Sequence, residues 1–350
     1  MVESLLLLGT LACLSSSVCV PDTHAVAPVS SRTLDGNELL KIGDIHEVQH
    51  HLQEALPYYQ RAAEAYRAKR QNRGEATALV KAGEVLARLE RHPEAVAVLQ
   101  QAVLLWQGLD QDGLHARTLL ALGLAEEAMD RRGDAQRAYE HARMLFERAH
   151  DRKGYTDSLL RLGNLKIVED RAAEGLALLD AALADARIRH DSGQQVAALT
   201  VIGKVRMQEG ELAAARLLFD EGLRLVEAER NLRGEAELRI SQARLDDLEG
   251  RFQDGIAAAQ RALVLYQTLR DRSNEADTLS LLGSLHQASG NMTWAIEHHQ
   301  RALALYRALR DVHREAASML NLAIAYEAQG LLQDAQEHRA EALLLLQSSH

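Results

Sequence analysis

The sequence repeats a pattern of small and apolar positions every forty residues. Written in rows of forty, it aligns one column of small residues: Gly43, Gly83, Gly123, Gly163, Gly203, Ala243, Gly283 and Ala323. Four residues earlier stands an apolar column, broken only by Arg239: Leu39, Leu79, Leu119, Leu159, Leu199, Leu279 and Met319. Because four residues are about one helical turn, both columns lie on one helix face. The pattern predicts a helix around this column in every row.

Two further columns of small residues predict a second helix in each row. One column stands twelve residues after the first: Ala55, Ala95, Ala135, Gly175, Ala215, Gly255, Ala295 and Ala335. Another follows seven residues later: Ala62, Ala102, Ala142, Ala182, Gly222, Ala262, Ala302 and Ala342. Small side chains let two helix backbones approach closely where they cross. Each row therefore predicts a helical hairpin.

Glycines predict the turns inside the hairpins. They stand seven residues after the first column in four rows, at Gly210, Gly250, Gly290 and Gly330. Glycine adopts the left-handed conformation that ends many helices. Two rows depart from the pattern, because Arg239 and Gln242 replace leucines in row six and Pro57 interrupts the second helix of row one. We expect these two rows to pack less regularly.

These rows carry a family resemblance. The segment EADTLSLLGSLHQASGNMTWAIEHHQRALALYRALRD, residues 275 to 311, resembles the tetratricopeptide repeat in its forty-residue form. The resemblance covers residues 33–350 and implies an all-α, right-handed superhelical solenoid of about eight hairpins, preceded by a separate segment at residues 1–32. It implies a protein-binding scaffold but names no partner, because such repeats serve many functions.

The segment at residues 1–32 suggests export. Its apolar run from Leu5 to Leu14 has the length of a signal peptide, is too short to span a bilayer, and precedes possible cleavage sites after Ala25 and Ala27. A periplasmic or secreted protein is the favoured interpretation. Against it, Glu3 stands where a basic residue is expected. The alternative is a cytoplasmic protein whose uncleaved apolar helix covers the first repeat.

Composition and charge exclude several classes of function. The formal charge of −10 and the pI near 5.8 argue against a nucleic-acid-binding protein, which would carry a basic domain or stripe. Both cysteines, Cys13 and Cys19, precede the repeats, so the repeats hold no disulfide framework and no thiolate metal site. We find no phosphate-binding loop and no catalytic triad pattern. The sequence predicts a non-enzymatic protein without a cofactor or an evident small-molecule substrate.

One motif argues for an enzyme. His46, Glu47 and His50 form H-E-x-x-H, which on a continuous helix can bind zinc and activate a water molecule. The forty-residue period, however, places His50 in the turn column. The repeats also leave no room for a catalytic domain with a third metal ligand. A metal-dependent hydrolase is therefore only a remote alternative, and we predict no metal site.

A partner-binding surface follows from the resemblance, which implies that the first helices line a concave groove. The first six rows each place one basic residue on that side, and row four adds an asparagine: Lys41, Lys81, Arg117, Arg161, Asn164, Lys204 and Arg244. One interpretation is a solvated helix face. The functional hypothesis is a ladder of positive charge that binds an acidic peptide or helix of a partner protein.

The carboxyl end suggests a third function, which is assembly. The segment EALLLLQSSH, residues 341 to 350, holds Leu344 and Leu345 in a row that no hairpin follows. Solenoids usually end in a helix with a polar outer face. Uncovered leucines could dock a second copy or another subunit, whereas the alternative is a frayed, modestly apolar end.

Overall fold

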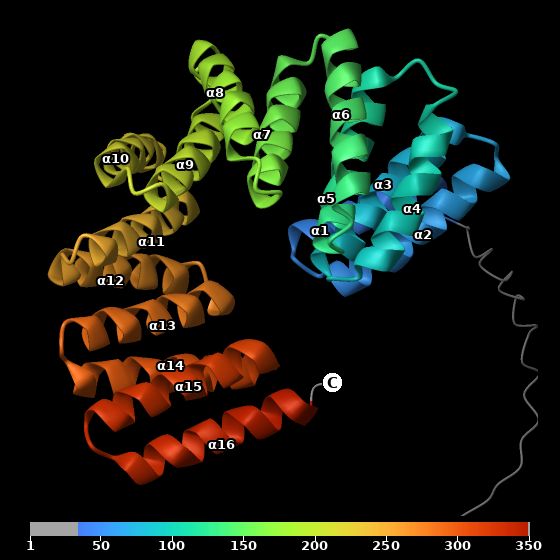
Figure 1. The fold of residues 1–350 in the computed structure, drawn as a ribbon. Coiled ribbons are helices and arrows are strands. Elements are labelled where there is room, and N and C mark those ends of the chain that lie inside the picture. The colour runs from blue at the N-terminus through green and yellow to red at the C-terminus, as the bar shows by residue number, and fades with distance from the viewer. Residues whose placement is uncertain (1–33, 349–350) are drawn as a thin grey trace, which may run out of the picture.

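The computed structural model describes residues 34–348, and this range forms sixteen α-helices and no strand (Figure 1). The helices are α1 (Gly36–Val48), α2 (Leu52–Ala68), α3 (Asn72–Arg88), α4 (His92–Trp106), α5 (Asp112–Ala128), α6 (Arg132–Arg148), α7 (Arg152–Val168), α8 (Ala172–Ile188), α9 (Ser192–Gln208), α10 (Leu212–Ala228), α11 (Leu232–Leu248), α12 (Phe252–Thr268), α13 (Arg272–Ala288), α14 (Met292–Leu309), α15 (Val312–Ala328) and α16 (Leu332–Ser348). The export signal predicted within residues 1–32 lies outside the described residues.

Consecutive helices pair into eight hairpins, which we number as repeats one (α1 and α2) to eight (α15 and α16). This confirms the predicted all-α, right-handed superhelical solenoid. Besides contacts between consecutive helices, the main contacts join odd-numbered helices of neighbouring repeats, such as α7 with α9. The odd helices therefore line the inner, concave side, and the stack curves through an arch in Figure 1. Between residues 34 and 348, every helix is too short or too polar to cross a membrane.

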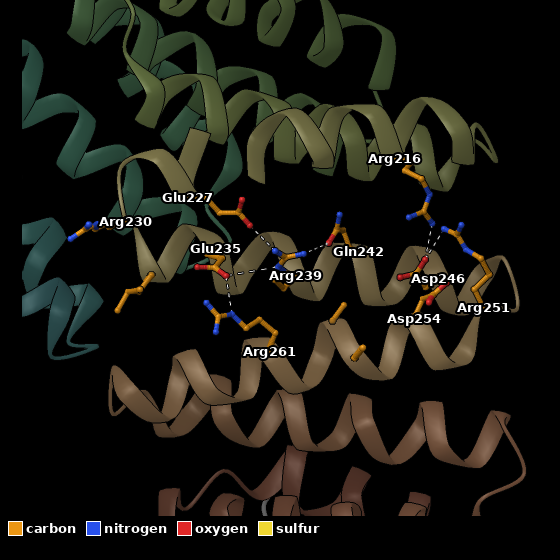
Figure 2. Close-up of a pocket in the computed structure, with 13 residues that line it drawn as sticks. Arg216, Glu227, Arg230, Glu235, Arg239, Gln242, Asp246, Arg251, Asp254 and Arg261 are labelled. Carbon is orange, nitrogen blue, oxygen red and sulfur yellow. Dashed lines mark hydrogen bonds and ion pairs between the residues drawn. The ribbon is translucent and has the colours of Figure 1, made fainter. Parts of the chain in front are cut away.

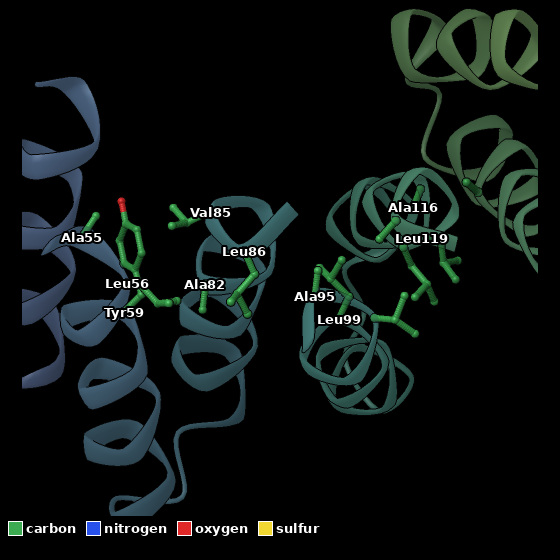
Figure 3. Close-up of a cluster of buried hydrophobic side chains, with 14 of the residues drawn as sticks. Ala55, Leu56, Tyr59, Ala82, Val85, Leu86, Ala95, Leu99, Ala116 and Leu119 are labelled. Carbon is green, nitrogen blue, oxygen red and sulfur yellow. The ribbon is translucent and has the colours of Figure 1, made fainter. Parts of the chain in front are cut away.

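The small-residue columns mark the places where helices touch. A Cβ atom on Gly43 would lie 2.5 Å from Cε1 of Tyr59, and one on Gly123 would lie 2.5 Å from Cε1 of Tyr139. Larger side chains close around these contacts to form the core. Figure 3 shows one stretch of it, in which α2, α3, α4 and α5 contribute buried residues such as Leu99. The core is thus a strip that runs along the solenoid.

Caps and turns recur with the same period as the core. The first helix of six repeats begins at an Asp or Asn whose side chain accepts a hydrogen bond from the backbone three residues later: Asp35, Asp151, Asp191, Asn231, Asp271 and Asp311. The predicted glycine turns are confirmed, since Gly210, Gly250, Gly290 and Gly330 all have positive φ. Ten other turns place a non-glycine residue in the same conformation: His50, Arg70, Glu90, Asp130, His150, Asp170, His190, Arg230, Arg270 and Arg310.

These non-glycine turns are strained, and a glycine substitution should relieve the strain. We expect His150→Gly and His190→Gly each to raise the free energy of unfolding by about 0.5–1 kcal/mol, because the left-handed conformation is costly for residues with a Cβ atom. Both side chains are exposed, so little packing is lost. Urea unfolding followed by circular dichroism measures the change. Gly210→Ala, at φ 81°, should change stability in the opposite direction, and a gain from that variant would contradict the explanation.

The two rows expected to pack less regularly differ in outcome. Helix α2 runs unbroken from Leu52 to Ala68 with Pro57 on its exposed face, so the proline does not shorten it. In repeat six the departure does change the packing. Arg239 and Gln242 open a charged slit beside α11, which is described below.

Candidate partner-binding groove

The H-E-x-x-H residues take part in local packing. Helix α1 ends at Val48, so His50 lies in the turn with φ 61°, and the His46 ring stacks on Tyr58 with 5.3 Å between centroids. Glu47 accepts hydrogen bonds from the hydroxyl of Tyr59 (2.7 Å) and from Nη1 of Arg88 (2.8 Å). Across residues 34–348, no group of three or more His, Cys, Asp or Glu side chains could hold a metal ion.

A groove of about 680 Å³ lies on the concave side, between α5 and α11. Helices α7 and α9 supply most of its lining, and Asn231, Arg233, Gly234 and Glu237 close it at the α11 side. Three of the predicted residues, Arg161, Asn164 and Lys204, meet in this groove. Arg244 lies outside its lining but is close enough that its charge acts on Lys204.

One wall of the groove is held by a buried amide. Gln194, only 4% exposed, donates hydrogen bonds from Nε2 to the carbonyl oxygen of Lys153 (2.9 Å) and to Oδ1 of Asp157 (2.5 Å). Asp191, the N-cap of α9, accepts a hydrogen bond from the backbone nitrogen of Gln194 at 3.0 Å. Asp157 and Asp191 are therefore already paired with groups of the protein itself.

Three cations around the groove have no such partner. Arg161, Lys204 and Arg244 are exposed and make no ion pair with any residue in the described range. Partial desolvation by the surrounding protein lowers the pKa of the Lys204 ammonium, and the nearby Arg244 guanidinium lowers it further, whereas the Glu237 carboxylate opposes the shift. An anionic ligand would relieve this repulsion, because opposite charge favours the charged form. The groove thus carries unpaired positive charge in an otherwise acidic protein.

The other predicted cations lie elsewhere. Lys81 is within 3.4 Å of Asp44 and 3.5 Å of Glu47, and Arg117 is 3.2 Å from Asp151. Lys41 is exposed on α1 and outside the groove lining. Of the six predicted cations, only three unpaired charges therefore remain around the groove, on α7, α9 and α11.

Two kinds of groove residue were not predicted from the sequence. Lys153 and Arg233 line the groove from the first turns of α7 and α11, ten residues before the small-residue column, where Arg73 stands in repeat two. The recurrence of a basic residue at this repeat position could have been recognised in the sequence. The second kind is the apolar lining, which includes Leu120, Leu124, Leu160 and Val201. The groove accordingly offers positive charge beside an apolar surface.

The predicted end interface is divided between surface and core. Leu344 is 66% exposed, whereas Leu345 is partly buried against the last core cluster, which contains Met319 and Leu322. The exposed apolar neighbour of Leu344 is Leu343, at 58%.

Comparison with known proteins identifies the repeats. The family profile described as "Tetratricopeptide repeat" matches residues 37–103, 74–148 and 274–348, which together make up more than half of the chain. The chain belongs to the tetratricopeptide repeat family. No curated protein matches the sequence.

Several solved tetratricopeptide and related solenoids share the fold. BtubC (BKLC) from P. vanneervenii is 19% identical with a TM-score of 0.57, and the match covers 63% of this chain and 91% of that one. The STAND protein PH0952 from Pyrococcus horikoshii, with its tetratricopeptide repeat sensor, is 12% identical with a TM-score of 0.66 over 90% of this chain, but only 48% of that longer chain is covered. The Rap conjugation gene regulator of plasmid pLS20 is 14% identical with a TM-score of 0.58, covering 89% and 95% of the two chains.

Proposed function

We propose that this protein is a non-enzymatic scaffold that binds an acidic segment of a partner protein in the concave groove between α5 and α11. The observation that carries the proposal is the set of three unpaired cations, Arg161, Lys204 and Arg244, on successive inner helices. Carboxylates of a bound segment would take the place of the missing ion-pair partners.

The apolar lining supports a peptide rather than a simple ion as the ligand. Leu124 is 38% exposed at the groove, and Leu120, Leu160 and Val201 lie beside it. Affinity for a segment comes mainly from buried apolar contacts, and the charges add orientation and selectivity. A segment that combines acidic and apolar side chains therefore suits the groove. The similar solenoid of the pLS20 regulator was solved in complex with the Phr* peptide, which supports peptide binding by such folds.

Charge reversal in the groove tests the proposal. We expect Arg161→Glu plus Lys204→Glu to weaken binding of an acetylated and amidated Glu-Leu-Glu-Leu-Glu-Leu probe by about tenfold or more, which corresponds to about 1.4 kcal/mol. Fluorescence anisotropy measures the affinity. The wild-type affinity should also fall as salt rises, because the groove charges are exposed.

A matched control separates local from overall charge. Arg137→Glu plus Arg224→Glu makes the same change in net charge on the outer helices α6 and α10, where both arginines are exposed. This control should keep wild-type affinity. Equal losses in the two double variants, or no loss in the groove variant, would refute the groove as the binding site.

Docking through the carboxyl end is a second candidate function. It is favoured by the adjacent exposed side chains of Leu343 and Leu344 on α16. This interface would join the solenoid to a second copy or to another subunit. If Leu344→Glu removes a native partner in crosslinking experiments while the groove variant retains it, the end interface is the better assignment.

A further inference from the structure

A second cavity, of about 810 Å³, lies between α10 and α12 (Figure 2). Helix α11 forms its floor with Glu235, Arg239, Gln242 and Asp246, and the flanking helices and turns supply the walls. None of its lining residues belongs to the groove described above. We refer to this cavity as the repeat-six slit.

The slit lies where repeat six has polar residues in place of the apolar residues of the forty-residue pattern. Its residues Arg239 and Gln242 stand where repeat seven has the buried leucines Leu279 and Leu282. Arg239 donates a hydrogen bond to Glu227 at 2.6 Å, and Gln242 donates one to Asp220 at 2.7 Å. Small side chains, Ala257 and Ala258, form part of the α12 wall. A polar floor in a place that normally holds core side chains costs stability, which is a reason to look for a ligand.

Buried carboxylates mark the two ends of the floor. Glu235 is 7% exposed and Asp246 is 4% exposed, and they stand eleven helical residues apart, or about 16 Å. Arg261 donates a hydrogen bond to Glu235 at 3.0 Å. Arg216 and Arg251 each donate one to Oδ1 of Asp246 at 2.7 Å. Both buried acids are therefore neutralised by arginines from the walls.

After this pairing, one charge of each sign is left over. At the Glu235 end, Arg230 makes no ion pair with any described residue, and at the Asp246 end the same is true of Asp254. The two side chains stand at opposite ends of the cavity in Figure 2. Burial raises the pKa of Asp246, and the Asp254 carboxylate adds to the rise, whereas the Arg216 guanidinium opposes it.

We infer that the repeat-six slit is a second binding site, which takes a short extended peptide segment with an acidic side chain at one end and a basic side chain at the other. The acidic side chain would pair with Arg230, and the basic one with Asp254. An extended chain rises about 3.3 Å per residue, so roughly six residues span the floor. The volume lies in the usual range of ligand sites, about 300–1,000 Å³.

Four probe peptides test this inference with the full chain. Each is acetylated, amidated and fluorescently labelled, with the sequence X-Ser-Ala-Ala-Ser-Z. The end residues X and Z are Glu and Arg, Glu and Glu, Arg and Arg, or Gln and Gln. We expect the Glu/Arg peptide to bind about tenfold or more tightly than the Gln/Gln peptide. Equal binding of all four peptides would overturn the inference.

Charge swaps at the two unpaired residues sharpen the test. Arg230→Glu makes both ends acidic and should shift the preference to the Arg/Arg peptide. Asp254→Lys makes both ends basic and should shift it to the Glu/Glu peptide. The double variant restores one charge of each sign, so it should again prefer the Glu/Arg peptide, bound in the reverse direction. Unchanged preferences in the single variants would overturn the inference. Both residues are exposed, and circular dichroism checks that the variants fold.

Filling the slit separates it from the concave groove. Arg239→Leu plus Gln242→Leu restores the apolar pattern and should abolish binding of the Glu/Arg peptide, while the Glu-Leu-Glu-Leu-Glu-Leu probe still binds. If the groove variant Arg161→Glu plus Lys204→Glu instead removes the Glu/Arg peptide, that peptide binds in the groove and the slit assignment is wrong.

Discussion

Lowering the pH from about 7 to about 4 is expected to destabilise repeat seven by about 3 kcal/mol through one histidine. His299 is fully buried, with its Cε1 atom 2.5 Å from the place where a Cβ of Gly283 would lie, and neither ring nitrogen has a hydrogen-bond partner. Burial lowers the pKa of His299 to about 4, and the neighbouring His298 contributes to the decrease. The folded protein therefore holds this ring neutral.

The sign of the effect follows from proton binding. An unfolded histidine has a pKa of about 6.5. Between that value and about 4, the unfolded chain binds a proton that the folded chain does not bind. Above about pH 6.5, His299 therefore does not reduce the free energy of unfolding. The free energy of unfolding decreases as the pH falls from that value to about 4. His286, whose pKa is also lowered by burial, changes stability in the same direction.

A substitution isolates the contribution of His299. His299→Phe places in repeat seven the side chain that Phe219 provides at the matching position of repeat five. Urea midpoints measured from pH 7.5 to 4.5 should change less in this variant than in the wild type. His313→Phe, at an exposed position of α15, should retain the wild-type dependence. The same pH dependence in all three proteins would show that His299 does not titrate as described.

Gly175→Ala is expected to lower the free energy of unfolding by about 2 kcal/mol. This loss is expected even though alanine is more stable than glycine in a helix interior by about 1 kcal/mol. A Cβ atom at this position would lie 2.7 Å from the carbonyl oxygen of Gly163 and 3.2 Å from the backbone nitrogen of Ile167. Backbone atoms cannot rotate away as a side chain can, so α7 and α8 would have to separate.

Gly113→Ala is the matched control for this prediction. Its added methyl group would meet only the Cβ atom of Ala149, at 3.9 Å. The control should be neutral or stabilising in the same urea experiment. Similar effects of the two substitutions would show that the contact between α7 and α8 is looser than the distances indicate.

The fold could be predicted from the sequence because its determinants are local and repeated. A close helix crossing tolerates only small side chains. Gly43, Ala55 and their equivalents therefore indicate the same helix contact in each of the eight repeats. The period also placed His50 in a turn, which left a metal-dependent hydrolase as only a remote alternative. The turns at His150 and Arg230 were harder to predict, because among residue types only glycine strongly indicates the left-handed conformation.

The groove could be predicted only in part. Arg161, Asn164 and Lys204 were placed by the period, but the ion pairs that occupy Lys81 and Arg117 reach into neighbouring hairpins and depend on how the repeats stack. The slit was signalled by Arg239 and Gln242. Its walls were not, because they come from α10, α12 and the turns on either side of α11.

The recurring N-caps make the forty-residue unit exchangeable. Asp191 and Asn231 each accept a hydrogen bond from the backbone nitrogen three residues ahead, at 3.0 Å in both cases. Deleting residues 192–231 would join Asp191 to Leu232 and leave one such cap before an intact helix. Duplicating the same stretch would add a hairpin without a new kind of turn. Recombination within the gene could thus lengthen or shorten the superhelix by whole forty-residue units.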